Sequence, residues 1–526
     1  MNKSSILYTE RTSTTTQATE INNSGAVAYK ETAEQSLAKL ICVGFLDNKY
    51  YTQATEQLEL VKKLSSECSE EFVAACALYT KKQHMKDMCV VLLALLRQRK
   101  SPYWKQIFPK VCDDGSSIRR FLKTIQTGQF GSKNLNYAGR KLIQSWFSSR
   151  RPIDVWNQSI GANPSLSAVM AMAHPSPKGD KQREAVYKLI RKGEHSEDLP
   201  EQIQTYYNWL KDTTQPIPRV PFERIKGEKL SEEQWQIFAQ QMTWNQLRQN
   251  INNLEKKGVF NNQQVAETLA AKLANEQEIV KANLFPHEIY TSYLNVTNQR
   301  MRIGLQQALD YSLRNVPTLE GNVILSIDVS GSMGAKVNGN TEAPRAGVDH
   351  RLTCFQVASL MACAFLKKNP NSKVYTFDSS AREITSNLNP MDSLVTNVDR
   401  IGFSGSSTSI ASSLQSVQGA KHKVDYFVMF SDDENNKQYI NYGRSTEAHA
   451  AWKNIKRNNP NAKFVMIDLQ GTSNTQLPTD PDVLYVSGFN NGMFEVIRNW
   501  SMLKETSFEK EIMKYASQGT GALERV

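Results

Sequence analysis

The apolar run at residues 323–327 is followed at once by Asp328-Val-Ser-Gly-Ser332, and this junction constrains the fold more than any other part of the chain. A run of branched aliphatic residues predicts a buried strand, and the glycine lets the chain turn sharply where the strand ends. The turn brings the oxygen-bearing side chains of Asp328, Ser330 and Ser332 around one point. Because Mg²⁺ prefers oxygen ligands and keeps several waters, the junction predicts a divalent-metal site.

Two later positions supply further oxygen donors. Thr408 ends the segment Ser404-Gly-Ser-Ser-Thr408, and Asp432 follows the apolar run at residues 426–431. Ligands of open α/β sheets collect where strands end, so we expect these side chains at the same edge as Asp328. Taken alone, Ser-Gly-Ser is also ordinary turn chemistry. The combined pattern predicts Mg²⁺, or another divalent cation, held by Asp328, Ser330, Ser332, Thr408 and Asp432.

The positive charge is concentrated in the first part of the chain. At 526 residues the chain is too long for one core, which predicts more than one domain. Residues 321–526 contain 21 Lys and Arg against 20 Asp and Glu, so the first 320 residues carry +10 of the net charge of +11. A strongly basic half beside a nearly neutral half predicts that a polyanion binds the basic half.

Cysteine usage and the N-terminal residues indicate the compartment. The seven cysteines are odd in number and lack CxxC spacing, which is typical of reduced thiols in a cytosolic protein. No run of about 18 apolar residues is present, and the first residues lack a secretory apolar region. We therefore expect a cytoplasmic protein that does not bind membranes, with a flexible Ser/Thr/Asn-rich tail at residues 1–24.

The pattern from residue 33 to residue 311 is helical almost throughout. Ser231-Glu-Glu-Gln234 is a capping box that starts one of the helices. Short helices at regular spacing, without strands, are typical of paired helices that stack as repeats. We predict a HEAT-like ring or solenoid at residues 25–317. Examples of the expected helices are residues 33–43, 52–64, 70–82, 85–96, 118–127, 139–147, 183–191, 231–241 and 262–273.

After residue 317 the periodicity changes to alternating strands and helices. This alternation is typical of a doubly wound sheet with ligands at its carboxyl edge, here residues 318–526. The expected strands are residues 323–327, 373–377, 425–430, 463–467 and 483–486, and the expected helices are residues 353–367, 410–417, 446–457 and 493–502. The fold class is therefore α plus α/β.

Three clusters of basic residues lie in the helical half. On a helix from residue 181, four basic side chains share one face and Val186, Leu189 and Ile190 share the opposite face, so one side packs and the other is free to meet phosphates. A solvated helix face is the alternative interpretation of any single cluster. The candidate RNA-binding residues are Arg119, Arg120, Lys123, Arg140, Lys141, His174, Lys178, Lys181, Lys188, Arg191 and Lys192.

The metal residues resemble the metal-ion-dependent adhesion site of von Willebrand factor A domains, with Ser406-Ser407 where two glycines are commoner. A basic helical half followed by such a domain resembles the Ro autoantigen family, whose first half is the TROVE module. The matching stretches are residues 39–44 with Tyr50 and Tyr51, Arg140-Lys-Leu-Ile-Gln-Ser-Trp146, His174-Pro-Ser-Pro-Lys178, Asp328-Val-Ser-Gly-Ser-Met333, Phe430-Ser-Asp-Asp-Glu434 and Phe494-Glu-Val-Ile-Arg-Asn499.

The resemblance implies a non-catalytic, cytoplasmic RNA-binding protein, which we expect to be a monomer. In that family a helical ring takes single-stranded 3′ ends of misfolded RNAs, and its outer face binds Y RNAs. Bacterial members serve RNA maturation and decay by tethering an exoribonuclease through Y RNA. One departure is that residues 154–160 lack the basic residues that often precede the family's histidine. Arg150 and Arg151 are the candidate substitutes.

Two other classes of function compete with this interpretation. The first is a cytosolic A-domain adaptor that makes metal-dependent protein contacts and uses the helical half for protein binding. The second is a hydrolase with Asp328 as a haloacid-dehalogenase-type nucleophile. That chemistry uses a second carboxylate two residues later, where this chain has Ser330, and no Walker, HExxH or GxSxG motif is present. We therefore expect no enzymatic activity.

Overall fold

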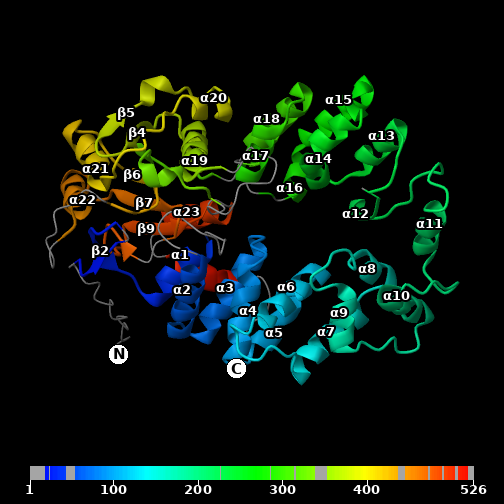
Figure 1. Cartoon of the computed structure of the whole chain (residues 1–526). Coiled ribbons are helices and arrows are strands. Elements are labelled where there is room, and N and C mark those ends of the chain that lie inside the picture. Colours follow the sequence, from blue (N-terminus) through cyan, green and yellow to red (C-terminus); the bar gives the residue numbers. More distant parts are fainter. Residues whose placement is uncertain are drawn as a thin grey trace, which may run out of the picture.

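The chain has two parts, a circuit of helices and a sheet domain to which both ends of the circuit are attached (Figure 1). The computed structural model describes residues 18–22, 24–42, 54–225, 227–282, 284, 286–312, 316–337, 352–435, 445–471, 474–488, 491–503 and 507–518. Within the described residues, no helix is both long and apolar enough to cross a membrane.

The helical half begins with the helices that lie in the lower row of Figure 1 and continues with those in the upper row. The helices of the lower row are α1 (Ala33–Cys42), α2 (Ala54–Glu67), α3 (Glu70–Lys82), α4 (Met88–Gln98), α5 (Tyr103–Val111), α6 (Gly115–Gln126), α7 (Tyr137–Ser149), α8 (Pro152–Asn157), α9 (Leu166–Ala173) and α10 (Lys181–Lys192). The later helices are α11 (Glu201–Trp209), α12 (Phe222–Ile225), α13 (Glu232–Gln241), α14 (Trp244–Lys256), α15 (Gln263–Leu273), α16 (Glu276–Ala282), α17 (Pro286–Asn295) and α18 (Gln299–Ser312), with a short 3₁₀ turn, η1 (Val259–Asn261), between α14 and α15.

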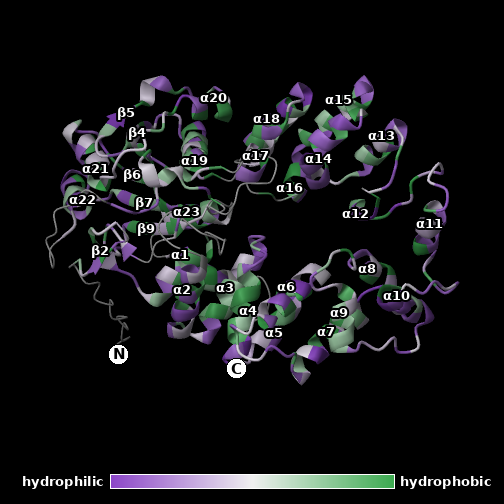
Figure 2. Cartoon of the chain, viewed as in Figure 1, coloured by the Kyte–Doolittle hydropathy of each residue, from purple (hydrophilic) through white to green (hydrophobic). Residues whose placement is uncertain are grey.

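Local sequence explains where these helices begin. Ser69 caps α3 by accepting a hydrogen bond from the Phe72 N–H at 3.1 Å, and the predicted capping box of Ser231 and Gln234 is present at α13. Helix α4 is buried from Met88 to Arg97, whereas α10 keeps an exposed polar face, a contrast visible in Figure 2. The predicted helices are therefore confirmed, with ends that differ by a few residues.

The two rows meet at the end of the molecule farthest from the sheet. Arg224 of α12 donates a hydrogen bond to the Trp156 carbonyl of α8 at 2.5 Å, and its guanidinium lies 3.6 Å from the centre of the Trp156 ring. Phe222 of α12 stacks on Phe238 of α13, with centroids 5.5 Å apart. Helix α12 therefore joins the two rows, and the helical path leaves the sheet domain and returns to it.

The main sheet has the strand order β5-β4-β3-β6-β7-β9, in which only β5 runs antiparallel. Its strands are β3 (Val323–Asp328), β4 (Lys373–Phe377), β5 (Ala381–Glu383), β6 (Tyr426–Ser431), β7 (Lys463–Asp468) and β9 (Val483–Ser487). The helices of this domain are α19 (Cys354–Lys368), α20 (Leu394–Asp399), α21 (Ile410–Gly419), α22 (Glu447–Asn458), α23 (Asn491–Leu503) and α24 (Phe508–Gln518), with the 3₁₀ turns η2 (Gly331–Gly334) and η3 (Thr385–Asn387).

Alternate residues of each strand face opposite sides of the sheet and pack into two different hydrophobic cores. Ile324, Phe427 and Phe464 face the core shared with α21 and α22, whereas Leu325 and Val428 face a larger core that continues into the helical half. Burial on both faces explains why these strands read as continuous apolar runs. The predicted doubly wound sheet is confirmed, and the edge strand β5 was not predicted.

The N-terminal segment belongs structurally to the sheet domain. Strand β2 (Val27–Lys30) pairs with β1 (Glu20–Ile21) and with β8 (Asn474–Thr475), and α1 packs against β9. The boundary predicted at residue 25 therefore does not coincide with a structural boundary. The reason is long-range strand pairing, which local periodicity does not reveal. Most of the predicted tail, residues 1–17 and 23, lies outside the described residues.

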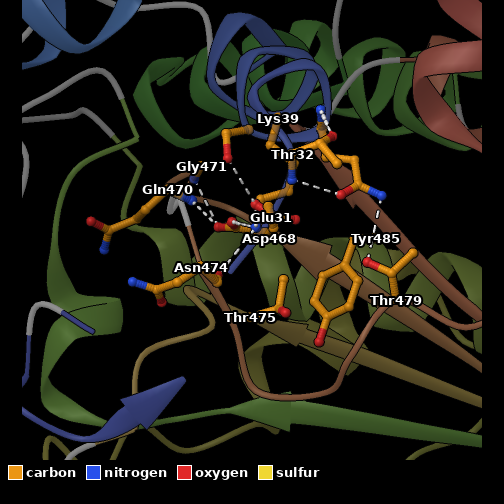
Figure 3. A network of polar contacts seen from close by, with 12 residues as sticks. Glu31, Thr32, Lys39, Asp468, Gln470, Gly471, Asn474, Thr475, Thr479 and Tyr485 are labelled. Carbon is orange, nitrogen blue, oxygen red and sulfur yellow. Dashed lines mark hydrogen bonds and ion pairs between the residues drawn. The ribbon is translucent and has the colours of Figure 1, made fainter. Parts of the chain in front are cut away.

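A buried charge network holds this segment in place (Figure 3). Lys39 is 1% exposed, and its ammonium lies 3.2 Å from the Glu31 carboxylate and 3.5 Å from the Asp468 carboxylate. Burial alone would lower the pKa of Lys39, but the charges of Glu31 and Asp468 outweigh it and raise the pKa. A charged lysine thus links α1 to the end of β7.

Candidate functional site

The carboxyl edge of the sheet brings the predicted metal residues together. Strand β3 lies between β4 and β6, so the chain moves to one side after β3, where it forms β4 and β5, and to the other side after β5. Ligands of open α/β sheets bind at such a switch point, because the loops that follow the two central strands diverge there. Asp328 ends β3 and Asp432 follows β6, which places both carboxylates at this point.

The turn after β3 is organised by its own side chains. Asp328 accepts hydrogen bonds from the Ser330 N–H at 2.9 Å and from the Ser431 hydroxyl at 2.6 Å. The hydroxyl oxygens of Ser330 and Ser332 lie 3.3 Å apart. All of these residues are buried, so the hydroxyls and the carboxylate form one compact group of oxygen atoms.

The loop that carries Thr408 lies against this turn. The Gly331 N–H donates to the Ser406 carbonyl at 2.8 Å, and the N–H groups of Ser404 and Gly405 donate to the Val329 carbonyl. A Cβ atom on Gly331 would lie 3.0 Å from the Gly405 carbonyl oxygen, so the close approach of the two loops favours glycine there. The contact positions the loop so that Thr408, which is 2% exposed, lies at the same edge.

The surroundings of Asp328 and Asp432 disfavour the charged forms of both carboxylates. Burial raises the pKa of Asp328 to about 6. Burial, and then the charge of Asp328, raise the pKa of Asp432 well above 3.8. A bound cation would relieve both effects. Within the described residues, no group of three or more His, Cys, Asp and Glu side chains is placed to hold a metal. The predicted donor set of two carboxylates and three hydroxyls consists of oxygen ligands, which suit a hard cation.

Three residues at this edge were missed by the sequence reasoning. Ser431 orients Asp328, and Gln470 donates to Asp432 at 3.3 Å. Asp378, which follows β4, accepts the Ser380 N–H at 2.9 Å; burial would raise the pKa of Asp378, but its hydrogen bonds lower it. An acidic residue directly after a predicted strand was a signal that could have identified Asp378, whereas nothing in the local sequence marks Gln470.

Gln470 also connects the metal edge to the buried lysine. Its backbone N–H donates to Asp468 at 2.9 Å, and the other carboxylate oxygen of Asp468 lies near Lys39 (Figure 3). The neighbouring Gly471 N–H also donates to Asp468, at 2.8 Å. The polar interactions thus run without a break from Asp432 to the N-terminal helix α1.

The second and third basic clusters are adjacent in space. Gln144 of α7 donates to the carbonyl of Ala173 at 2.7 Å and to that of His174 at 3.3 Å, which holds the end of α9 against α7. Arg183 of α10 donates to the Phe147 carbonyl at 2.6 Å and to the Arg150 carbonyl at 2.9 Å. Helices α7, α9 and α10 therefore form one block, and we call its exposed basic residues the α7–α10 surface: Arg140, Lys141, His174, Lys178, Lys181, Lys188, Arg191 and Lys192.

The faces predicted for α10 are observed. Val186 and Leu189 are buried, Ile190 is half-buried, and the four basic residues are exposed. Lys188 forms an ion pair with Glu184 at 2.9 Å and Lys192 with Glu194 at 3.4 Å. Such exposed pairs contribute little stability, so they leave the lysines available to a stronger anion.

The first basic cluster consists of Arg119, Arg120 and Lys123, and its two arginines contact other residues of the protein. Arg119 donates to the Gln158 carbonyl at 2.9 Å, and Arg120 forms an ion pair with Asp87. Lys123 is exposed and has no ion-pair partner among the described residues. Helix α6 contacts both α4 and α9, so this cluster adjoins the block that carries the α7–α10 surface. Two of its three members thus have structural contacts that the charge pattern did not reveal.

The candidate substitutes, Arg150 and Arg151, also have partners. Arg150 donates to the Asp113 carbonyl at 2.6 Å, and Arg151 forms an ion pair with Asp154 at 2.8 Å. The tryptophans Trp104, Trp146 and Trp156 are core residues, with exposed fractions of 3%, 6% and 1%.

The sheet topology and its loop of Asp, Ser and Thr side chains define a von Willebrand factor A domain carried by a circuit of helices. Residues 322–501 match the family model described as the Ro60 vWA domain. The chain is similar in structure to the Ro (RSR) protein of Deinococcus radiodurans, with a TM-score of 0.60 and 19% identity, over 90% of this chain and 100% of that chain. No curated protein sequence matches the chain. Residues 322–501 are thus similar to the Ro60 vWA domain, and the chain shares the fold of the Deinococcus Ro (RSR) protein, in agreement with the resemblance.

Proposed function

We propose that this chain is a non-catalytic RNA-binding protein of the Ro type. The observation that carries the proposal is the combination of a Ro60-type vWA domain with a helical half whose fold matches a bacterial Ro protein. The basic charge of the helical half supports it, because a polyanion is the partner that such a half attracts.

The α7–α10 surface supplies the site on the helical half. Arg140, Lys178, Lys181 and Arg191 are exposed and have no ion-pair partner among the described residues. Each can contact a phosphate and release counterions. Structured RNA of the Y type binds this surface, and single-stranded 3′ ends of misfolded RNAs bind within the circuit of helices. The protein acts in the cytoplasm in RNA quality control, maturation or decay, and it meets an exoribonuclease through the RNA.

The metal edge has a separate role in this proposal. Asp328, Ser330, Ser332, Thr408 and Asp432 hold Mg²⁺, directly or through water. When bound, the cation supplies positive charge that compensates two buried carboxylates and an open position for an acidic group. Ser431 and Gln470 orient the carboxylates through the hydrogen bonds described above.

Filter binding at two salt concentrations tests the RNA proposal. We expect the double substitution Lys188→Glu with Arg191→Glu to weaken binding of a stem-loop RNA at least tenfold and to reduce the salt slope by about 2, because each phosphate contact contributes about 1. The matched control is Lys453→Glu with Arg457→Glu on α22, which places the same charge change on an exposed helix of the sheet domain. Equal binding by both variants and the wild-type chain would reject the proposal in favour of the adaptor interpretation.

A further inference from the structure

A cavity of about 640 Å³ lies where the two rows of helices meet. It is bordered by the end of α8, the segment before α12, the end of α13 and the first turn of α14. In Figure 1, α12 lies between α8 and α13 on the side farthest from the sheet. The cavity is therefore remote from the metal edge and distinct from the α7–α10 surface.

Four of the five polar side chains around this cavity have no partners of their own; the fifth, Gln246, accepts hydrogen bonds from Thr243. Within the described residues, Asn157, Arg219, Gln240 and Gln241 form no side-chain hydrogen bond or ion pair. Neighbouring amides are engaged: Gln234, for example, donates to the Thr213 carbonyl at 2.6 Å. These three amides and the guanidinium can therefore donate and accept hydrogen bonds with a ligand in the cavity.

The other walls of the cavity are apolar and fixed. Phe222 and Phe238 stack with an interplanar angle of 12°, and Met242 is 2% exposed. The Arg224 contacts hold the Phe222 segment to α8, and Lys272 donates to the Met242 carbonyl at 2.5 Å. The cavity thus offers an apolar wall that is already in place, beside polar groups that are free to bond a ligand.

This chemistry matches an unpaired nucleotide. Asn and Gln amides present a donor and an acceptor on one edge, which pair with the edge of a base. Unpaired RNA bases are recognised through such edges and through contact with their flat faces, and guanidinium groups bind phosphate. Arg219 is the only cation of the lining, so the cavity does not suit a polyphosphate.

We propose that this cavity binds one nucleotide of single-stranded RNA, with Asn157, Gln240 and Gln241 reading the base edge and Arg219 contacting the phosphate. The inference rests on the proposed RNA-binding function and names a subsite for it. It predicts that the base, and not only the backbone, contributes to binding at one position of a bound strand.

Fluorescence anisotropy with labelled single-stranded RNA tests the subsite. We expect Gln240→Ala with Gln241→Ala to weaken binding about tenfold without changing the salt slope, because a base contact carries no counterion release. Arg219→Ala should reduce the salt slope by about 1. The control is Gln236→Ala, a half-buried amide on the same helix that bonds Glu232 and does not line the cavity; it should bind like the wild-type chain.

RNA strands that each carry one abasic residue, at a different position in each strand, test whether the protein recognises a base. At one position, loss of the base should weaken the wild-type chain about tenfold and leave the double variant unchanged. If every abasic strand weakens both proteins equally, or if the double variant binds like the wild-type chain, the subsite is rejected and the RNA-binding function stands. If the wild-type chain binds no RNA at low salt, the proposed function fails and the subsite fails with it.

Discussion

The two candidate sites of this protein are built by opposite principles. At the metal edge, Asp328 and Asp432 are separated by more than a hundred positions and both are fully buried. Ser431 donates a hydrogen bond to Asp328, and Ser332 forms a hydrogen bond with Asp432. On the α7–α10 surface, the basic residues are exposed, and they are distributed over helices α7 and α10 and the segment between α9 and α10. A parallel sheet brings ligands to one point because every strand ends at the same edge.

The difference sets how each site responds to a single substitution. A converged, buried site depends on every member, since each ligand supplies a large share of the contacts to one bound cation. A dispersed surface gains its affinity from many contacts of similar size, so each contributes little by itself.

The buried lysine should be the most sensitive position. Lys39→Met leaves Glu31 and Asp468 without their cation, and we expect the free energy of unfolding to fall by about 3–5 kcal/mol. Urea denaturation measures the change. The control is Lys30→Met, which removes an exposed lysine of the same segment and should cost little. A loss no larger than that of the control would show that the network does not hold the N-terminal segment.

The effect of Asp432→Asn on the free energy of unfolding should depend on whether Mg²⁺ is present. With chelator present, the variant should be at least as stable as the wild-type chain, because repulsion from Asp328 is removed. At a Mg²⁺ concentration 100 times the dissociation constant, the wild-type chain should gain about 2.7 kcal/mol and the variant should not. Thermal melting with and without Mg²⁺ measures both effects, and Asp399→Asn at an exposed position is the control. Equal Mg²⁺ responses would argue against a cation at this edge.

Single substitutions on the α7–α10 surface should have modest and additive effects. Arg140→Ala and Lys178→Ala should each weaken RNA binding severalfold and lower the salt slope by about 1, and their combination should lower it by about 2. Filter binding over a range of salt measures the slopes. If one of these single substitutions abolished binding, the surface would be a converged site and not a dispersed one.

The smallest effect should come from His449. Its ring lies 2.6 Å from the Tyr29 hydroxyl, and burial and Lys453 lower its pKa from 6.5 to about 4. Between these pH values the unfolded chain binds more protons, so stability should fall as the pH falls from 6.5 toward 4, by an amount on the order of 1 kcal/mol. Urea denaturation of the wild-type chain and of His449→Gln isolates this contribution. Identical pH profiles would exclude it.

The sequence was informative wherever neighbouring residues decide the outcome. The strand at residues 373–377 was predicted with its observed ends, because a buried strand of a parallel sheet is a continuous apolar run. The Ser231 capping box was recognisable because its two partners lie three residues apart. The same local logic connected Asp328, Ser330 and Ser332, and the position of Asp432 directly after a strand added the fourth member of the set.

Only the tertiary structure decided which side chains serve as partners across large separations in sequence. The pairing of β2 with β8, the ion pairs of Lys39 and the bond from Gln470 to Asp432 join residues that no local pattern relates. The same holds for Arg119 and Arg120, which look like RNA-binding residues in a charge count but contact Gln158 and Asp87. Hydrophobic periodicity and capping are encoded within one or two helical turns, whereas a partner is chosen by chain topology and packing, which depend on the whole molecule at once.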